Sequence, residues 1–390
     1  MLNVLYVFGG EKASGAEKVI QRLVVQNING VNAHLFISPG GFAQSLIDDP
    51  DTAFSKITLL NQLKKLNRSS TSKLRFYLLG LSNYFSVSFI VLRYISKHKI
   101  NVVHANTIVP ASYLLPAIWF SKICYPKVKW VWSDHDLKYF SSLDHKISSL
   151  CVKAYDLTLA VSNAVKKKYQ TQNTKVVVLY NGLNLNEFKK DDILRENFRN
   201  NLAVSGQTIV IGLAGTIEPR KGQLALIKAF EAINREFTDC RLLLAGVPSA
   251  DHPAYMDEVL NYAGKNKPVT YIGKINDMPA FYNACDILIN NSNSDGSEPL
   301  GTTIYEAMAC EKIVAASNTG GTAEIIDDKV NGYLFEPDNE ASIYQTLKYI
   351  ITHINDQQKV TTKAREKVAG RFNIASMAAN YNLFFTSNKN

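Results

Sequence analysis

The chain has 390 residues, of which 46% are hydrophobic and 20% charged, so it is long enough for two ordinary domains with substantial cores. It contains no repeat of solenoid period and no low-complexity segment, which excludes a repeat protein. The formal net charge of +9 is unevenly placed, because residues 1–188 carry a net +12 and residues 189–390 a net −3.

The first predicted strand, residues 3–8, is apolar and runs into a glycine-rich turn. Gly9, Gly10 and Gly15 lie in this turn, before a helix predicted from about Lys18. Glycines let the backbone approach a phosphate or sugar closely. Every doubly wound domain needs a tight first turn, however, so the turn alone does not establish a ligand site.

A long stretch of the first half is basic and free of acids. Residues 53–132 contain twelve Lys and Arg and no Asp or Glu, interleaved with apolar runs such as residues 76–79 and 89–92. A basic, aromatic-rich surface can bind anionic lipid head groups, with each exposed cation contributing on the order of 1 kcal/mol. Nucleic acid is the rival partner and a solvated basic face the structural alternative. No nucleic-acid recognition module is present, so we predict peripheral contact with an anionic membrane and no nucleic acid.

No segment offers about 20 uninterrupted apolar residues, the length that a spanning helix needs. Residues 76–95 come closest but contain Asn83 and Arg93, so a soluble body is expected. The amino terminus has no basic flank before an apolar core and is interpreted as mature fold, without a signal peptide. Five scattered cysteines, never in C-x-x-C spacing, indicate reduced thiols in a cytosolic compartment.

Residues 130–136 end another predicted apolar strand, which places His135 at the carboxyl edge of the sheet. A satisfied structural histidine is the alternative interpretation of this residue. The other six histidines have no partner at metal-ligand spacing, so we predict no metal and no cofactor.

The domain boundary is predicted at a short charged segment, residues 188–192, before a new strand at Ile209. Strands alternate with helical patterns on both sides, as in βαβ units. The sequence therefore predicts an α/β protein with two Rossmann-like domains, residues 1–188 and 189–371. Residues 372–390 begin with an aromatic-rich helical pattern.

The second domain opens with a pattern typical of a phosphate loop. A strand at residues 209–211 precedes a glycine-containing loop with Arg220 and Lys221, and an amphipathic helix follows at residues 224–233. Two cations in such a loop can bind a diphosphate. A solvated Arg-Lys pair is the alternative.

The most informative stretch follows a buried strand at residues 287–289. Residues 290–301 are predicted as a loop and residues 302–310 as the next helix. The amino end of that helix exposes unpaired N–H groups, so Gly301, Thr302 and Thr303 can hold a diphosphate. Glu298 lies on the loop, and Glu306 leans back toward the same pocket, where a carboxylate can accept from a ribose diol. Both acids could instead be solvated surface residues.

The segment that contains Glu298 and Glu306 resembles the E-x-F-G-x-x-x-x-E-A-M-A signature of retaining glycosyltransferases of family 4. Leu300 replaces the customary Phe, and Glu311 replaces the Gly that usually follows the helix. The phosphate loop resembles the family segment G-R-x-x-x-x-K-G, with Lys221 matching its lysine and Thr216 in place of its arginine.

Further similarities keep the order of the family along the chain. Residues 181–183 resemble the N-G-V-D mark, residues 318–324 resemble the G-G-x-P-E turn through Gly320 and Gly321, and residues 331–335 resemble the N-G-x-L-F hairpin. No single match is decisive, but their order and spacing together are specific.

The resemblance implies the GT-B architecture, two doubly wound domains facing each other across a cleft, with residues 372–390 returning onto the first domain. It implies that Glu306 binds the ribose of a nucleotide-diphosphate sugar and that Lys221 and the helix amino end bind its diphosphate. Glu298, His135 and Lys221 are the implied catalytic residues. The implied donor-binding residues are Gly9, Gly10, Gly15, Arg220, Lys221, Leu300, Gly301, Thr302, Thr303, Glu306, Gly320 and Gly321.

The implied reaction is retaining, metal-independent transfer of a sugar from a UDP- or GDP-linked donor. The implied acceptor is a glycan or lipid-linked molecule in the assembly of cell-surface lipopolysaccharide or capsule, at the cytoplasmic face of the membrane. Two alternatives stay open at this point. One is a nucleotide-sugar epimerase or phosphorylase of the same architecture, and the other is a non-enzymatic membrane or nucleic-acid adaptor, supported by Thr216 in place of arginine.

Overall fold

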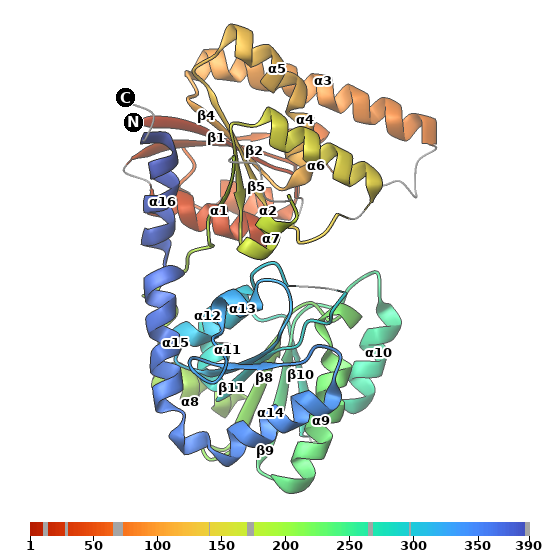
Figure 1. Ribbon diagram of the computed structural model, residues 1–390, viewed down its shortest axis with the longest axis vertical. Coiled ribbons are helices and arrows are strands. Elements are labelled where there is room, and N and C mark those ends of the chain that lie inside the picture. The colour runs from red at the N-terminus through yellow and green to blue at the C-terminus, as the bar shows by residue number, and fades with distance from the viewer. Residues whose placement is uncertain are drawn as a thin grey trace. The chain divides into compact units, whose positions relative to one another are not determined.

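The computed structural model describes residues 1–10, 15–27, 30–64, 73–139, 141–169, 175–263, 268–295 and 298–386. Parts of four predicted features lie outside these residues: 11–14 of the first turn, 65–72 of the acid-free basic stretch, 296–297 of the glutamate loop and 387–390 of the last helix. The chain divides into two compact units, Met1–Gly182 with Ile374–Asn390, and Leu183–Asn373 (Figure 1).

Unit 1 is built on a parallel sheet in the order β3-β2-β1-β4-β5-β6-β7. The strands are short and mostly apolar, as expected when helices cover both faces of a parallel sheet. They are β1 (Leu2–Phe8), β2 (Val31–Ile37), β3 (Lys56–Leu59), β4 (Val102–Asn106), β5 (Lys129–Asp134), β6 (Leu157–Ala160) and β7 (Val176–Val178).

The helices of unit 1 pack on the two faces of this sheet (Figure 1). They are α1 (Gly15–Gln26), α2 (Gly41–Ile47), the single turn η1 (Asn61–Leu63), α3 (Lys73–His98), α4 (Ile108–Tyr113), α5 (Leu115–Cys124), α6 (Ser142–Ala154), α7 (Asn163–Lys167) and α16 (Ile374–Thr386). Apolar side chains of α1, α2 and α16 form one buried core with the sheet. A buried hydrogen bond of 2.8 Å between the ring of His104 and the Tyr381 hydroxyl joins α16 to β4.

Unit 2 contains a second parallel sheet, in the order β10-β9-β8-β11-β12-β13. Its strands are β8 (Ile209–Ala214), β9 (Cys240–Ala245), β10 (Val269–Gly273), β11 (Ile287–Asn290), β12 (Ile313–Ser317) and β13 (Tyr333–Phe335). Its helices are α8 (Asp192–Asn201), η2 (Pro219–Lys221), α9 (Gln223–Glu236), α10 (Pro253–Tyr262), α11 (Met278–Ala284), α12 (Thr302–Ala309), α13 (Thr322–Ile325), α14 (Glu340–Thr352), η3 (Ile354–Asp356) and α15 (Gln358–Arg371). The α/β architecture predicted from alternating strand and helix patterns is confirmed in both units.

The chain passes between the units at slightly different positions from those predicted. Residues 183–188, predicted in the first domain, belong to unit 2, as do residues 372 and 373. The backbone N–H of Leu183 donates to the carbonyl of Phe372 at 2.8 Å, and the Phe372 ring stacks on Tyr305 with centroids 5.5 Å apart. The segment around Leu183 and the end of α15 are therefore tied to each other and to unit 2.

Helix α3 is longer and more apolar than the sequence analysis predicted for a helix that does not span a membrane. Residues Leu78–His98 are 21 residues long with a mean hydropathy of 1.4, which is enough by length and composition to cross a membrane. Asn83 and Arg93 lie within this stretch without lowering the average below that of a candidate span.

Candidate active site

Three neighbouring strands of unit 2 end at one edge of the sheet. β8, β11 and β12 lie side by side and run parallel, so the loops that follow them emerge together. These loops are residues 215–222, 291–301 and 318–321. The topology therefore gathers the predicted phosphate loop, the glutamate loop and the double-glycine turn, although they are far apart in the sequence.

Lys221 and Glu298 form the centre of this edge. The Lys221 Nζ lies 2.6 Å from the Glu298 Oε2, and the two side chains are 16% and 12% exposed. Ser292 donates to the same carboxylate oxygen at 2.9 Å and accepts from Lys221 at 3.4 Å. Burial by itself would raise the pKa of Glu298, but the Lys221 ammonium and the hydrogen bonds outweigh it, so this pKa is lowered and the carboxylate is charged at neutral pH.

The double-glycine turn supports the backbone of the glutamate loop. The Gly321 N–H donates to the Glu298 carbonyl at 2.8 Å. A Cβ on Gly320 would lie 2.1 Å from that carbonyl oxygen, and a Cβ on Gly321 would lie 2.3 Å from the Pro299 oxygen. Only glycine allows this approach, so the turn positions Glu298 through backbone contact.

The amino end of α12 completes the edge. Gly301 is its N-cap in the left-handed region at φ 66°, and no side chain caps the helix there. Thr302 and Thr303 occupy the first turn, where the Thr303 hydroxyl accepts from Asn290 at 3.1 Å. Leu300 is only 2% exposed, so its side chain serves the packing of unit 2, and only its backbone is available to a ligand.

Glu306 is more enclosed than predicted. It is buried in the second turn of α12, where its Oε2 accepts from the Tyr282 hydroxyl at 2.8 Å. Burial first, and then the Glu306 charge, raises the pKa of Tyr282, so Tyr282 stays a donor. The position of the Glu306 carboxylate is therefore fixed by Tyr282 of α11 as well as by the backbone of α12.

The charge of Arg220 acts at this site, since it helps to lower the pKa of Glu298. Its guanidinium is paired with Glu218 of its own loop, at 2.6 Å from Nη2 to Oε1. The Arg220 carbonyl accepts from the Asn293 N–H at 2.9 Å, which joins the phosphate loop to the glutamate loop. Arg220 therefore supports the loop structure through its backbone, while its charge acts on both Glu218 and Glu298.

The remaining predicted residues lie in unit 1. Gly9 and Gly10 are half-buried after β1, and Gly15 is the exposed first residue of α1. A Cβ on Gly9 would lie 3.0 Å from the Pro110 side chain, so close packing against α4 accounts for this glycine. His135 Nε2 lies 2.9 Å from the Asn106 Oδ1 after β5, and burial lowers the pKa of His135 to about 4. The imidazole is therefore neutral at physiological pH.

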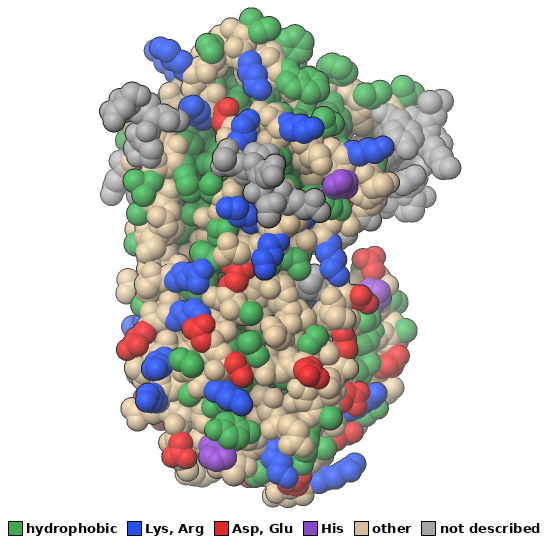
Figure 2. Space-filling model, in the orientation of Figure 1, with side chains coloured by type: hydrophobic (Ala, Val, Ile, Leu, Met, Phe, Trp, Pro, Cys, Tyr) green, Lys and Arg blue, Asp and Glu red, His purple; other side chains and the backbone are tan. Residues whose placement is uncertain are grey.

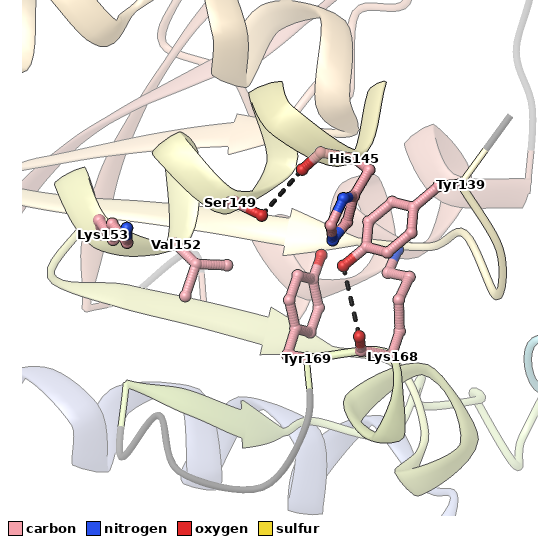
Figure 3. A pocket seen from close by; sticks show the side chains of 7 residues that line it. All are labelled: Tyr139, His145, Ser149, Val152, Lys153, Lys168 and Tyr169. Atoms are coloured by element: carbon pink, nitrogen blue, oxygen red, sulfur yellow. Dashed lines mark hydrogen bonds between the residues drawn. The ribbon is translucent and has the colours of Figure 1, made fainter. Parts of the chain in front are cut away.

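A cavity of about 490 Å³ opens beside this histidine segment in unit 1. Figure 3 shows the rings of Tyr139, Tyr169 and His145 around it. The Lys168 ammonium lies 5.0 Å from the centroids of both tyrosine rings and pairs with the buried Asp134 at 2.6 Å. Burial, and then the Asp134 charge, raises the pKa of Asp136 to about 6. The complete lining is Tyr139, His145, Ser149, Val152, Lys153, Lys168 and Tyr169.

The sequence analysis missed three side chains that hold the site together. Ser292 bridges Lys221 and Glu298, Tyr282 holds Glu306, and the Asn291 amide donates to the Gly222 carbonyl at 2.8 Å. The polar run Asn290-Asn291-Ser292 directly after an apolar strand was the available signal for two of them. Tyr282 carried none, because α11 precedes the strand that leads into the loop.

Among the residues that the structure describes, no cluster of three or more His, Cys, Asp or Glu could hold a metal ion. The five cysteines are free thiols, and four of them are buried. The charged groups described at the edge of unit 2 include Lys221, Glu298, Glu306 and the Glu218–Arg220 pair.

Two family models match the chain in succession. The model described as "Glycosyltransferase Family 4" matches residues 29–187, and the one described as "Glycosyl transferases group 1" matches residues 194–367.

Curated relatives match about half of the chain. An uncharacterized glycosyltransferase of Methanocaldococcus jannaschii is 29% identical over 233 residues, which cover 57% of this chain and 58% of that protein. A lipopolysaccharide 1,2-N-acetylglucosaminetransferase of Salmonella typhimurium is 27% identical over 214 residues, covering 53% of this chain and 55% of that protein. Both matches thus span less than two thirds of the relatives' length.

Solved structures match the whole chain in fold. The Anabaena protein HepE in complex with UDP superimposes with a TM-score of 0.82 at 20% identity, covering 99% of this chain and 100% of that chain. The same protein in complex with UDP-glucose gives a TM-score of 0.81 at 21% identity, with the same coverage. A sucrose-phosphate synthase from Thermosynechococcus elongatus gives 0.78 at 17% identity, covering 99% of both chains. At these identities the likeness is one of fold.

Proposed function

Because the chain belongs to the group 1 glycosyltransferases of family 4 and has their GT-B fold, we propose that unit 2 binds a nucleotide-diphosphate sugar whose sugar is transferred to an acceptor. The observation that carries this proposal is the Lys221–Glu298 pair beside the uncapped amino end of α12. A cation and a set of free helix N–H groups at one point form a site for a diphosphate. A carboxylate at the same point suits the sugar that the diphosphate carries.

Glu306 would accept hydrogen bonds from the ribose diol while Tyr282 holds its other side. The Gly320–Gly321 turn would lie beside the sugar, since its backbone contacts that of Glu298 and Pro299. UDP is the nucleotide we favour, because the HepE structures contain UDP and UDP-glucose, and GDP is the second choice.

The chemical difficulty of the transfer is charge. An oxocarbenium-like centre forms on the sugar while negative charge grows on the leaving diphosphate. Lys221 and the α12 amides would stabilise the diphosphate as preorganised donors, so the proposal requires no metal. Glu298 would stabilise the positive sugar centre. We propose retention of the anomeric configuration, with the acceptor attacking the face that the diphosphate leaves and the leaving phosphate taking the acceptor proton.

Unit 1 would bind the acceptor. Its cavity offers tyrosine rings, which pack against the apolar face of a sugar, together with the polar tips of His145, Ser149 and Lys153 (Figure 3). The cavity is joined to the His135 segment, because Lys168 donates to the Asp136 carbonyl at 2.7 Å. Neutral His135 would serve the transfer as a hydrogen-bonding group.

The acceptor class that fits best is a glycan or lipid-linked glycan of the cell surface. The similarity to a lipopolysaccharide glycosyltransferase supports it, as does the basic first half of the chain. We therefore propose that the protein works in the cytoplasm at the inner face of the membrane, in lipopolysaccharide or capsule assembly.

Calorimetry with UDP and GDP tests the donor site. Lys221→Ala and Glu306→Ala should each weaken nucleotide binding at least tenfold, while Lys228→Ala should leave it unchanged. Lys228 is a suitable control because it is an exposed lysine on α9, paired with Glu340. Unchanged affinity and full transfer activity in both site variants would remove the assignment. Sugar turnover without an acceptor would instead favour an epimerase.

A further inference from the structure

Helix α3 has two separate apolar faces. Val87, Val91 and Ile95, spaced four residues apart, are buried against unit 1. On the other side, exposed apolar residues recur at intervals of three and four and are 57–62% exposed; they are Leu78, Leu81, Phe85 and Phe89. An amphipathic surface helix of a globular protein carries polar residues at such positions. The outer row therefore has no explanation in the folding of unit 1.

Helix α5 extends the same apolar surface. Trp119, Phe120 and Ile123 are 56–82% exposed, while Leu115, Ile118 and Ser121 face the interior. Phe89 of α3 and Phe120 of α5 line one groove of about 810 Å³, so the two exposed rows adjoin. We call the seven exposed residues the α3–α5 face: Leu78, Leu81, Phe85, Phe89, Trp119, Phe120 and Ile123.

Cations surround the α3–α5 face. Arg93 and Lys97 line the groove, Arg75 lies toward the start of α3, and Lys122 lies on α5 between the exposed apolar residues. Arg93 lies 5.5 Å from the centroid of the Phe89 ring. The segment that contains both helices has no acidic residue from position 53 to 132. On the visible face, Figure 2 shows green and blue side chains, and little red, around α5 at the top of the molecule.

Apolar side chains flanked only by cations match one environment. The apolar side chains are stabilised in an apolar phase, and the cations are stabilised by anions at the boundary of that phase. An anionic bilayer interface provides both, through its acyl chains and its head groups. A water-soluble partner protein would need an apolar patch and an acidic rim together. A solvated face would not carry three phenylalanines, a tryptophan and three aliphatic side chains that all exceed half exposure.

The packing of α3 distinguishes lying in the interface from crossing the bilayer. Ser88 donates to the Tyr113 carbonyl at 3.0 Å and accepts from the Ala117 N–H at 3.0 Å. These bonds and the buried valines fix α3 to α4 and α5. Crossing a bilayer would expose that inner face to lipid and break both hydrogen bonds, whereas lying in the interface uses only the exposed row.

We propose that the α3–α5 face inserts into the interface of an anionic bilayer, with Phe85, Phe89, Trp119 and Ile123 among the acyl chains and the flanking cations at the head groups. The protein is then monotopic, held by apolar insertion as well as by charge. This gives the membrane contact of the proposed function a defined surface. Its test requires no nucleotide sugar, so either idea can fail without the other.

Trp119 is a natural probe, because the other two tryptophans of the chain, Trp130 and Trp132, are buried. Vesicles of phosphatidylglycerol and phosphatidylcholine should shift the tryptophan emission to the blue and reduce iodide quenching several-fold. Lipids brominated near the head-group end of the acyl chain should quench it. Trp119→Phe should abolish the spectral change while vesicle sedimentation persists.

The second arm measures how much of the binding is apolar. Phe89→Ser with Ile123→Ser should lower the vesicle-bound fraction at least tenfold, and Ile193→Ser is the matched control, since Ile193 is an exposed isoleucine on α8 of unit 2. Raising NaCl to about 0.5 M, which shortens the Debye length to about 4 Å, should weaken binding strongly.

Four results would overturn the proposal. The first is an unchanged Trp119 spectrum with anionic vesicles at low salt, and the second is equal binding to purely neutral vesicles. The third is retention on vesicles after an alkaline carbonate wash, which would indicate a spanning helix. The fourth is shielding of Trp119 that grows with protein concentration in the absence of lipid, which would make the face an interface between two copies.

Discussion

The Lys221–Glu298 pair provides the sharpest prediction, which concerns stability. At 2.6 Å, two unit charges attract by about 6 kcal/mol at an effective dielectric constant of about 20. Part of this is offset by the cost of removing both groups from water. Removing one partner alone leaves the other buried without its counter-charge, and we expect Lys221→Met or Glu298→Gln each to cost about 3 kcal/mol of unfolding free energy.

The double variant should cost less than the two single changes together, because it leaves no unpaired charge. We expect a coupling of about 2 kcal/mol in a double-mutant cycle, measured by urea unfolding at pH 7. Single changes that add to within about 0.5 kcal/mol would refute the reasoning. Lys228→Met, which removes an exposed lysine, is the control and should change stability little.

The effect of Glu298→Gln should also depend on pH in one direction. The folded-state pKa of Glu298 is lowered from its ordinary value of 4.5, since Lys221 and its hydrogen bonds outweigh the effect of burial. The stabilising contribution of the carboxylate is then complete above about pH 4.5 and is lost as the pH falls through the lower folded-state pKa. The stability gap between the wild type and Glu298→Gln should therefore narrow on acidification, and a constant gap would contradict this account.

Four further predictions concern the surrounding residues. Gly320→Ala should destabilise unit 2 by about 2 kcal/mol in thermal melting, because the φ of Gly320 is 53° and the new Cβ would meet the Glu298 carbonyl. Gly370→Ala is the control and should be neutral or stabilising, because no atom lies within 4 Å of a Cβ at that position. Tyr282→Phe should weaken UDP binding several-fold in calorimetry, since it releases Glu306; unchanged affinity would exclude a positioning role for Tyr282. His135 takes up a proton below its ordinary pKa of 6.5 in the unfolded chain but only below about 4 in the folded protein. Acidification to pH 5 should therefore lower the unfolding free energy of the wild type by about 2 kcal/mol more than that of His135→Gln. Equal losses in the two proteins would show that His135 is not buried as a neutral ring. Tyr139→Ala should raise the acceptor KM with little change in UDP affinity, and the reverse pattern would move the acceptor out of the unit 1 cavity.

The sheet edge of unit 2 that carries Lys221 and Glu298 shows how much of the candidate site could be predicted from the sequence. The glutamate loop, the phosphate loop and the double-glycine turn could each be recognised by motif, and their parallel strands implied a common edge. The partner of each side chain could not be predicted. Lys221 and Glu298 are 77 residues apart, and their ion pair depends on which strands are neighbours in the sheet.

The interpretation of Arg220 shows the opposite case. The motif predicts Arg220 and Lys221 as two cations that bind a diphosphate, and in the structure the Arg220 guanidinium pairs with Glu218, only two residues away. Local geometry, which a motif does not encode, decides between a ligand and a neighbouring carboxylate. The same holds for Leu300, whose side chain points into the packed interior.

The sequence by itself determined the two α/β units, the order of their motifs and the basic character of the first half, because these depend on local periodicity and composition. The tertiary structure decided which charges pair, which side of α3 is exposed and that α5 continues its apolar surface. Those outcomes depend on contacts between residues far apart in the chain. Periodicity can show that α3 is apolar, but only its packing shows that a second apolar face remains uncovered.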